Sequence, residues 1–208
     1  MNYDAADKAI KIINRENLKL FGRLKIRLMK TDELNIIRAV GDTYDASVRM
    51  AERQLLECAR LAYLAAMQES GKRKRNPIDR DWLIEFLMTA DPVTLYKFLP
   101  EAERKKARLT EALAATTERA KEVDKNLREW TRQIGQAAIG VTDAATIRAF
   151  KDAGVTHLVW HSEHDDRVCK VCNARDGNVY PIDELPLKHP NCRCWYSIAT
   201  DDFRRGTA

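Results

Sequence analysis

The sequence predicts a mainly α protein, with an elongated helical N-terminal region and a small β-rich C-terminal module stapled by zinc. The first three quarters of the 208 residues have helical patterns, and over residues 32–69 apolar residues recur mostly at three-, four- and seven-residue spacing, as on one face of a helix. After Gly154 the composition turns to β-branched and aromatic residues, which favour strands. Cysteine and histidine are unevenly placed: residues 1–156 hold one Cys and no His, whereas residues 157–194 hold four of each.

Capping and breaking residues set the expected limits of the helices. Asp4 can cap the first helix, and Gly22 is expected to break it. Ser70-Gly71 stops the longest helix, Asp91-Pro92 starts a short one, and Thr142-Asp143 caps the last. The expected helices span residues 5–20, 24–29, 32–69, 80–89, 91–99, 101–134 and 142–154.

A composition change near residue 154 predicts two domains. Residues 1–154 form the helical region, with a basic linker at about 71–78, and residues 155–200 form the β-rich module. Residues 201–208 are expected to be a flexible tail. The expected strands are Val155–Trp160, Asn178–Tyr180 and Trp195–Ile198.

Composition and charge exclude several classes of protein. An apolar content of 45% argues against a wholly disordered chain. No run approaches 18 consecutive apolar residues, so we expect no membrane span, and the N-terminus shows no secretory pattern. The net charge of +5 implies no particular partner by itself. Basic residues concentrate in the first half, including the run Lys72–Arg75, which is ordinarily a solvated linker.

Four cysteines and one histidine have the spacing of a metal site. A Cys-x-x-Cys turn brings two thiolates to one side of a loop, and a second set of ligands some 15–20 residues later closes a tetrahedral shell. A module this small buries too little apolar surface to be stable alone, and a structural metal ion can supply the missing stability. Thiolates with an imidazole favour zinc. We favour Cys169, Cys172, His189 and Cys192, with Cys194 as the alternative to His189 or Cys192. The candidate ligands are Cys169, Cys172, His189, Cys192 and Cys194.

Other interpretations of these residues remain open at this stage. The four cysteines of the module could form two disulfides, which the reducing compartment expected for a chain without a secretion signal disfavours. A redox-active Cys-x-x-Cys belongs at a helix N-terminus after a strand, whereas Pro-rich turns and a second Cys pair surround this one. A catalytic zinc would need an open position and a nearby base. Candidates precede Cys169 in a polar loop: His161, His164, Asp165 and Asp166.

The C-terminal string resembles the head-morphogenesis family of tailed bacteriophages, the Mu F-like minor head (minor capsid) proteins. Several spaced motifs agree in order over about residues 140–198. They are Ala153-Gly154-Val155, Trp160, Asp165-Asp166-Arg167-Val168-Cys169-Lys170-Val171-Cys172, Asp176-Gly177, Pro186 and His189-Pro190-Asn191-Cys192-Arg193-Cys194. The N-terminal helices are compatible with the helical first part of such proteins but carry no matching motif.

The resemblance implies a virion component associated with the portal and the capsid interior, assembled in the host cytoplasm. Family members act in head assembly, DNA packaging or genome delivery, and a zinc site is proposed for those with this Cys/His pattern. The implied partners are portal or major capsid proteins, with phage DNA as a further candidate and no small-molecule substrate. We therefore expect a non-enzymatic minor head protein. The alternatives are a zinc-dependent nucleic-acid-binding protein or nuclease, and a host-encoded zinc-ribbon adaptor.

Overall fold

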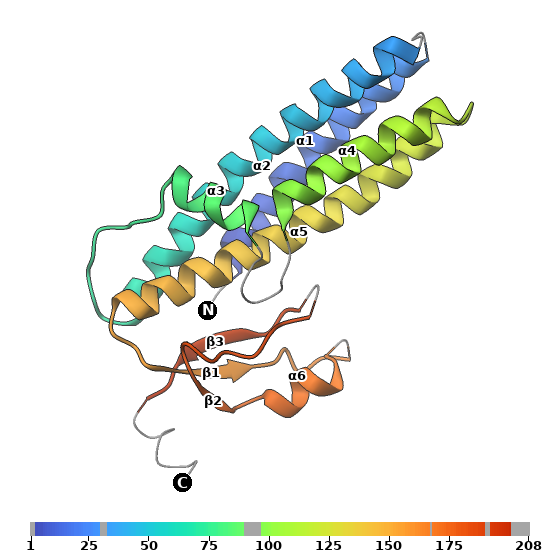
Figure 1. Cartoon of the computed structure of the whole chain (residues 1–208). Helices are drawn as coiled ribbons and strands as arrows, with labels where there is room; N and C mark the ends of the chain where they lie inside the picture. Colours follow the sequence, from blue (N-terminus) through green and yellow to red (C-terminus); the bar gives the residue numbers. More distant parts are fainter. Residues whose placement is uncertain (1–2, 30–32, 90–96, 167, 190–191, 201–208) are drawn as a thin grey trace.

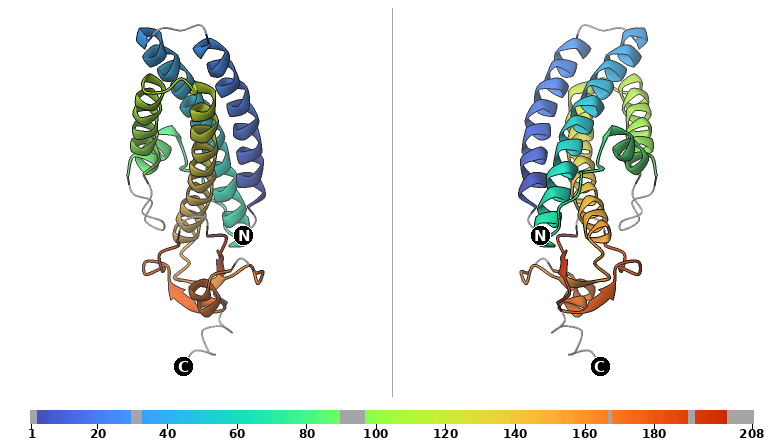
Figure 2. Two further views of the ribbon diagram at one scale, coloured as in Figure 1. Left: turned by 90° about the vertical axis from the view of Figure 1, so that its right-hand side faces the viewer. Right: turned by 90° about the vertical axis from the view of Figure 1, so that its left-hand side faces the viewer.

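A computed structural model describes residues 3–29, 33–89, 97–166, 168–189 and 192–200. It confirms the mainly α fold class, with an elongated bundle of helices and a small sheet at one end of it (Figures 1 and 2). No helix in the described ranges is both long and apolar enough to cross a membrane. The bundle helices are α1 (Asp4–Leu28), α2 (Glu33–Glu69), α3 (Arg80–Met88), α4 (Phe98–Ala114) and α5 (Arg119–Asp152).

The core of the bundle is centred on Trp130 of α5. Helices α1, α2 and α5 pack against one another, and α4 lies against α2 and α5. The fully buried Trp130 ring stacks on Phe98 at 5.2 Å and contacts Tyr44 at 5.4 Å between ring centroids. Its Nε1 donates a hydrogen bond of 2.8 Å to Ser47, whose hydroxyl donates in turn to Asn17 at 2.6 Å. Trp130 of α5 thus contacts α2 and α4 directly, and its hydrogen bond to Ser47 connects it to Asn17 of α1.

The sheet has three antiparallel strands in the order β2-β1-β3. The central strand buries three consecutive residues, which explains its apolar and aromatic sequence. Trp160 lies opposite Tyr196 of β3, and their rings meet edge to face with centroids 5.4 Å apart. The elements of this part of the chain are β1 (His157–His161), α6 (Lys170–Arg175), β2 (Val179–Pro181) and β3 (Trp195–Ile198).

Gly22 does not break the first helix, contrary to the sequence-based expectation. Helix α1 runs without interruption from Asp4 to Leu28. A glycine inside a helix costs about 1 kcal/mol relative to alanine. Phe21 and Leu24 flank it and are 0% and 1% exposed, and burying each side chain contributes about 1.5–3 kcal/mol. The free energy gained by burying Phe21 and Leu24 therefore exceeds the cost of keeping Gly22 in the helix.

The helix expected over 101–134 was also wrong, because the chain reverses direction in its middle. Helix α4 ends at Ala114 and α5 begins at Arg119. No glycine or proline marks the turn, whose Thr116 hydroxyl accepts a 3.0 Å hydrogen bond from the Glu118 backbone N–H. The fully buried Leu113 and Val123 lie on either side of the turn. Packing of two antiparallel helices decides its position.

Thr142-Asp143 does not cap a separate helix, because both residues lie inside α5. The Thr142 hydroxyl donates to the carbonyl of Ala138 at 2.8 Å, a bond that is compatible with a helix interior. The carboxylate of Asp143 pairs with Lys188 of the C-terminal part of the chain. The expected helix over 91–99 and the tail over 201–208 fall wholly or largely outside the described residues.

Candidate metal centre

The five candidate ligands come from two segments that the fold brings together. Cys169 is the N-cap of α6, and Cys172 lies in the first turn of that helix. The other three precede β3, and the Cys192 N–H donates a backbone hydrogen bond of 3.1 Å to the His189 carbonyl. Cys172, Cys192 and Cys194 are buried, Cys169 is half-buried, and His189 is exposed.

The donor atoms form two overlapping groups that share Cys172. One contains Cys169, Cys172 and His189, and the other contains Cys172, Cys192 and Cys194; the donor atoms within each group lie within 4.8 Å of one another. The Cys172 sulfur lies 3.2 Å from His189 Nε2 and 3.7 Å from the Cys192 sulfur. Two thiolates on a tetrahedral zinc ion, each about 2.3 Å from it, are about 3.8 Å apart. This geometry can hold a metal ion.

The cysteine thiols of the cluster differ in their pKa values. The backbone N–H of Cys172 points at the Cys169 sulfur from 3.3 Å and lowers the pKa of that thiol to about 7. Burial raises the pKa of Cys172 above its ordinary value. Burial, together with the nearby Cys192, raises the pKa of Cys194 to about 11. A bound cation would reverse this balance by favouring the thiolates, and its binding would release protons.

The placement of Cys169 differs from one expectation. It caps a short helix that follows a strand, which is the position of a redox-active Cys-x-x-Cys, whereas the sequence predicted only turns. The Cys-x-x-Cys motif is joined to the second group of cysteines through Cys172, an arrangement that is typical of a closed metal shell. A small hollow reaches this cluster from the surface. It is lined by Glu163, Val168, Cys169, Cys172, His189, Cys192, Arg193 and Cys194.

The polar residues before Cys169 do not converge on a second site. The His161 ring stacks on Trp195 at 4.1 Å, and His164 lies 3.2 Å from a carboxylate oxygen of Asp176. Asp165 pairs with Arg193 at 2.7 Å, and Asp166 is exposed. In the described part of the chain, the only sets of three or more potential ligands are the two cysteine groups.

A buried ion pair beside the cluster is a feature that sequence reasoning missed. Lys188 and Asp143 have fully buried side chains, with 2.7 Å between Nζ and Oδ2. The Tyr3 hydroxyl lies 2.8 Å from the other carboxylate oxygen of Asp143. Buried lysines are rare unless paired, but no local pattern distinguishes Lys188 from a surface lysine. Only the register of α5 against the C-terminal segment brings these residues together.

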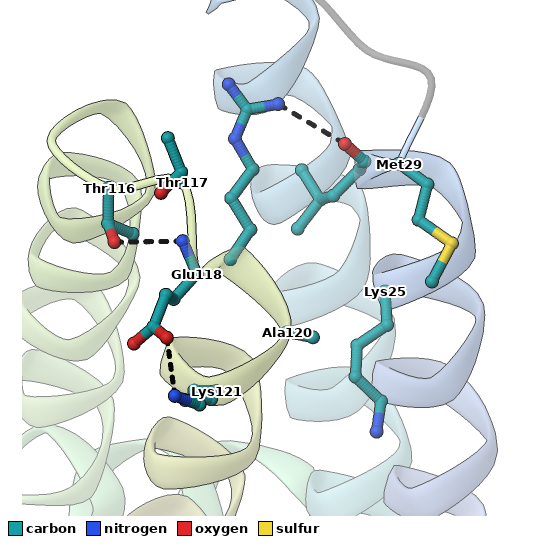
Figure 3. A pocket seen from close by; sticks show the side chains of 9 residues that line it. Lys25, Met29, Thr116, Thr117, Glu118, Ala120 and Lys121 are labelled. Atoms are coloured by element: carbon teal, nitrogen blue, oxygen red, sulfur yellow. Dashed lines mark hydrogen bonds and ion pairs between the residues drawn. The ribbon is translucent and has the colours of Figure 1, made fainter.

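A larger, open pocket lies at the other end of the bundle, between the end of α1 and the α4–α5 turn (Figure 3). Its carboxylate, Glu118, already pairs with Lys121, and Lys25 pairs with Asp124. Its described lining contains no cysteine or histidine. Its lining residues are Lys25, Leu28, Met29, Thr116, Thr117, Glu118, Arg119, Ala120 and Lys121.

Comparison with known proteins finds one family that is similar to part of the chain. The family model described as Phage Mu protein F like protein matches residues 105–197. That range runs from α4 into β3 and includes all five candidate ligands. The match confirms the resemblance predicted from the motifs, and it covers just under half of the chain. No curated protein and no solved structure matches the chain.

Proposed function

We propose, from the Mu F-like region over residues 105–197, that this protein is a non-enzymatic minor head protein that acts in phage head morphogenesis. The family match is the observation that carries this proposal, and a phage head family implies a virion component with capsid-related partners. The described residues offer long amphipathic helices and a compact C-terminal module. The proposed partners are the portal and major capsid proteins, which the exposed helix faces would contact.

The location of the protein tests this proposal directly. Mass spectrometry of purified virions and of procapsids is expected to detect the chain in both, at a few copies per head. Head preparations from a phage lacking the gene supply the control for contaminating peptides. Absence of the chain from both virions and procapsids would contradict a role as a head component, whatever the state of its metal centre.

A structural zinc ion is the second part of the proposal. The donors are soft thiolates with an imidazole, which suit zinc in a closed tetrahedral shell. Cys172 belongs to both groups of donors and, like Cys169, would be a ligand in each of the proposed sets. Cys169, His189 and Cys192 complete the favoured set. With a closed shell the ion supplies folding energy to the module and leaves no open position for substrate, which favours a structural role over the nuclease alternative.

Duplex DNA is a further proposed partner, supported by the connection between α2 and α3. Gly71, in the left-handed region at φ 67°, ends α2, and the buried Ile78 fixes the other end of the connection. Lys72, Arg73 and Arg75 are exposed, and none of them is paired with a described carboxylate. A loop that is fixed at both ends and carries three such cations can bind the phosphate backbone of DNA. Such binding depends on charge and does not read the base sequence.

Removing these three charges is expected to weaken binding to duplex DNA of any sequence. The Lys72→Ala, Arg73→Ala, Arg75→Ala variant should flatten the plot of log affinity against log salt by about 2–3 units, as expected from the loss of three phosphate contacts. Fluorescence anisotropy at several salt concentrations measures the slope. The charge-matched control replaces Lys8, Lys11 and Arg15 on α1 by alanine. Equal slopes for the two variants would exclude the loop as the DNA contact.

A further inference from the structure

The first residues of the chain, the middle of α5 and the segment before β3 meet at one buried polar cluster. We call it the Lys188 lock, and it consists of Tyr3, Asp143, Lys188 and the backbone carbonyl of Cys194. Lys188 Nζ donates to Asp143, to the Cys194 carbonyl and, at 3.3 Å, to the Tyr3 hydroxyl. An ammonium group has three donors. All three are therefore used inside the lock.

Further contacts fix the orientation of the lock. The Lys188 ammonium lies over the Tyr196 ring, 4.5 Å from its centroid, and makes a cation–π contact. The Tyr3 hydroxyl lies 2.8 Å from Asp143 Oδ1 and 2.9 Å from the Cys194 carbonyl. Burial, reinforced by the Asp143 charge, raises the pKa of Tyr3 well above its ordinary value, so the hydroxyl remains a donor. The lock therefore joins both sides of the helix–sheet junction.

The lock is also continuous with the candidate metal centre. Lys188 directly precedes His189, and the carbonyl that it binds belongs to Cys194. The described residues of this segment, 188–189 and 192–194, lie in no helix or strand, and the Lys188 side chain ties them to α5 through Asp143. A metal ion bound by ligands of this segment would fix it in place. Such an ion would therefore help to position both Lys188 and the Cys194 carbonyl.

We propose that the Lys188 lock couples metal binding to the docking of the C-terminal module on the bundle, and through Tyr3 to the start of α1. This inference rests on the metal centre of the proposed function. Loss of the ion would free residues 188–194 and take Lys188 out of the junction. Asp143 would then be a buried charge without its cation, a costly state that is relieved when the junction opens to water. The ion thereby determines whether the two parts of the molecule stay together.

Hydrogen–deuterium exchange of the full chain, with zinc and after chelation, tests this coupling. With zinc removed, amides over residues 4–13 of α1 and 140–146 of α5 are expected to exchange about tenfold faster, while those around Trp130 do not change. The Asp143→Asn variant should still bind zinc, but more weakly because the coupling is reciprocal, and it should exchange fast at these sites with or without the ion. Tyr3→Phe removes a single hydroxyl, leaves the bundle core intact, and should raise exchange over 4–13 about threefold in the presence of zinc.

A second ion pair across the same junction provides the matched control. Lys151 of α5 pairs with Asp183, but the two side chains are 43% and 78% exposed. Asp183→Asn is therefore expected to leave exchange at both sites and its dependence on zinc unchanged. The double variant Asp143→Leu, Lys188→Met removes both buried charges and should regain slow exchange over 4–13, because no unpaired charge remains in the junction.

The outcomes separate this inference from the metal proposal. If zinc leaves on chelation and exchange over residues 4–13 is unchanged, the lock does not transmit metal loading and the inference is wrong. The same holds if Asp143→Asn responds to chelation as the unmodified chain does. If elemental analysis finds no zinc in the purified chain, the metal centre itself is refuted and the coupling falls with it.

Discussion

Serine in place of Cys172 is expected to abolish tight zinc binding and to unfold residues 155–198 while the helical bundle survives. Cys172 is the donor common to both groups, so its loss removes one donor from each of them. Zinc affinity should fall by more than about 100-fold, since even residues that only support ligands cost 10–100-fold. Elemental analysis gives the zinc content, and near-ultraviolet circular dichroism reports the environment of Trp160 and Trp195.

The fifth cysteine supplies the control. Cys58 is buried in α2, with its sulfur 3.1 Å from the Thr142 hydroxyl, and it lies outside the cluster. Cys58→Ser is therefore expected to keep one zinc ion per chain. A Cys172→Ser protein that still holds zinc tightly, with the near-ultraviolet spectrum unchanged, would contradict the proposed structural site.

Two further variants in the same assay resolve the ligand set. With Cys169, Cys172, His189 and Cys192 as ligands, His189→Ala loses tight binding, whereas Cys194→Ser keeps it. Co²⁺ in place of zinc should then show the absorption of three thiolates. The reverse pattern, with a four-thiolate spectrum, would assign Cys194 in place of His189.

Replacing Trp130 by alanine is expected to have the largest effect on the bundle. The ring is fully buried, and its removal leaves a cavity between Phe98 and Tyr44 and deprives Ser47 of a hydrogen-bond donor. Large aromatic residues cost about 3–5 kcal/mol when they are truncated in a core. Urea unfolding followed by far-ultraviolet circular dichroism measures the change in free energy.

Trp82 is the matched comparison for Trp130. It lies on the short helix α3, is only partly buried, and stacks on Phe86 at 5.8 Å between ring centroids. Trp82→Ala is therefore expected to lower the free energy of unfolding by about 1–2 kcal/mol. Equal losses for the two variants would show that Trp130 is not the centre of the core.

The sequence predicted the parts of the fold that local chemistry determines. Trp195–Ile198 forms the expected strand because its residues suit a pleated, half-buried surface. The ligand cluster was found because Cys-x-x-Cys spacing is itself a geometric constraint, and the structure brings all five candidates together. Which four bind a metal, and the division into domains at residue 154, stay predictions.

The remaining features depend on contacts between segments far apart in the chain. Gly22 stays in a helix because Phe21 and Leu24 are buried by other helices. A cap and a buried helical aspartate look alike in sequence, so Asp143 was misassigned. Its partner Lys188 lies 45 positions away and carries no local signal of burial. Such positions become predictable only when the packing of the helices is known.

The strand order also has a consequence for how the C-terminal module forms. β1 lies between β2 and β3, and its pairing with β3 matches Leu158 with Ile198 across a long intervening segment. Closing a chain loop costs conformational entropy that grows with its length, by about 0.6 kcal/mol per doubling. A metal ion that joins Cys172 to Cys192 would already have closed the middle of that segment. Only the short chain segments on either side of the metal centre would then remain to be closed when β3 pairs with β1. Metal binding would therefore precede the completion of the sheet and accelerate it.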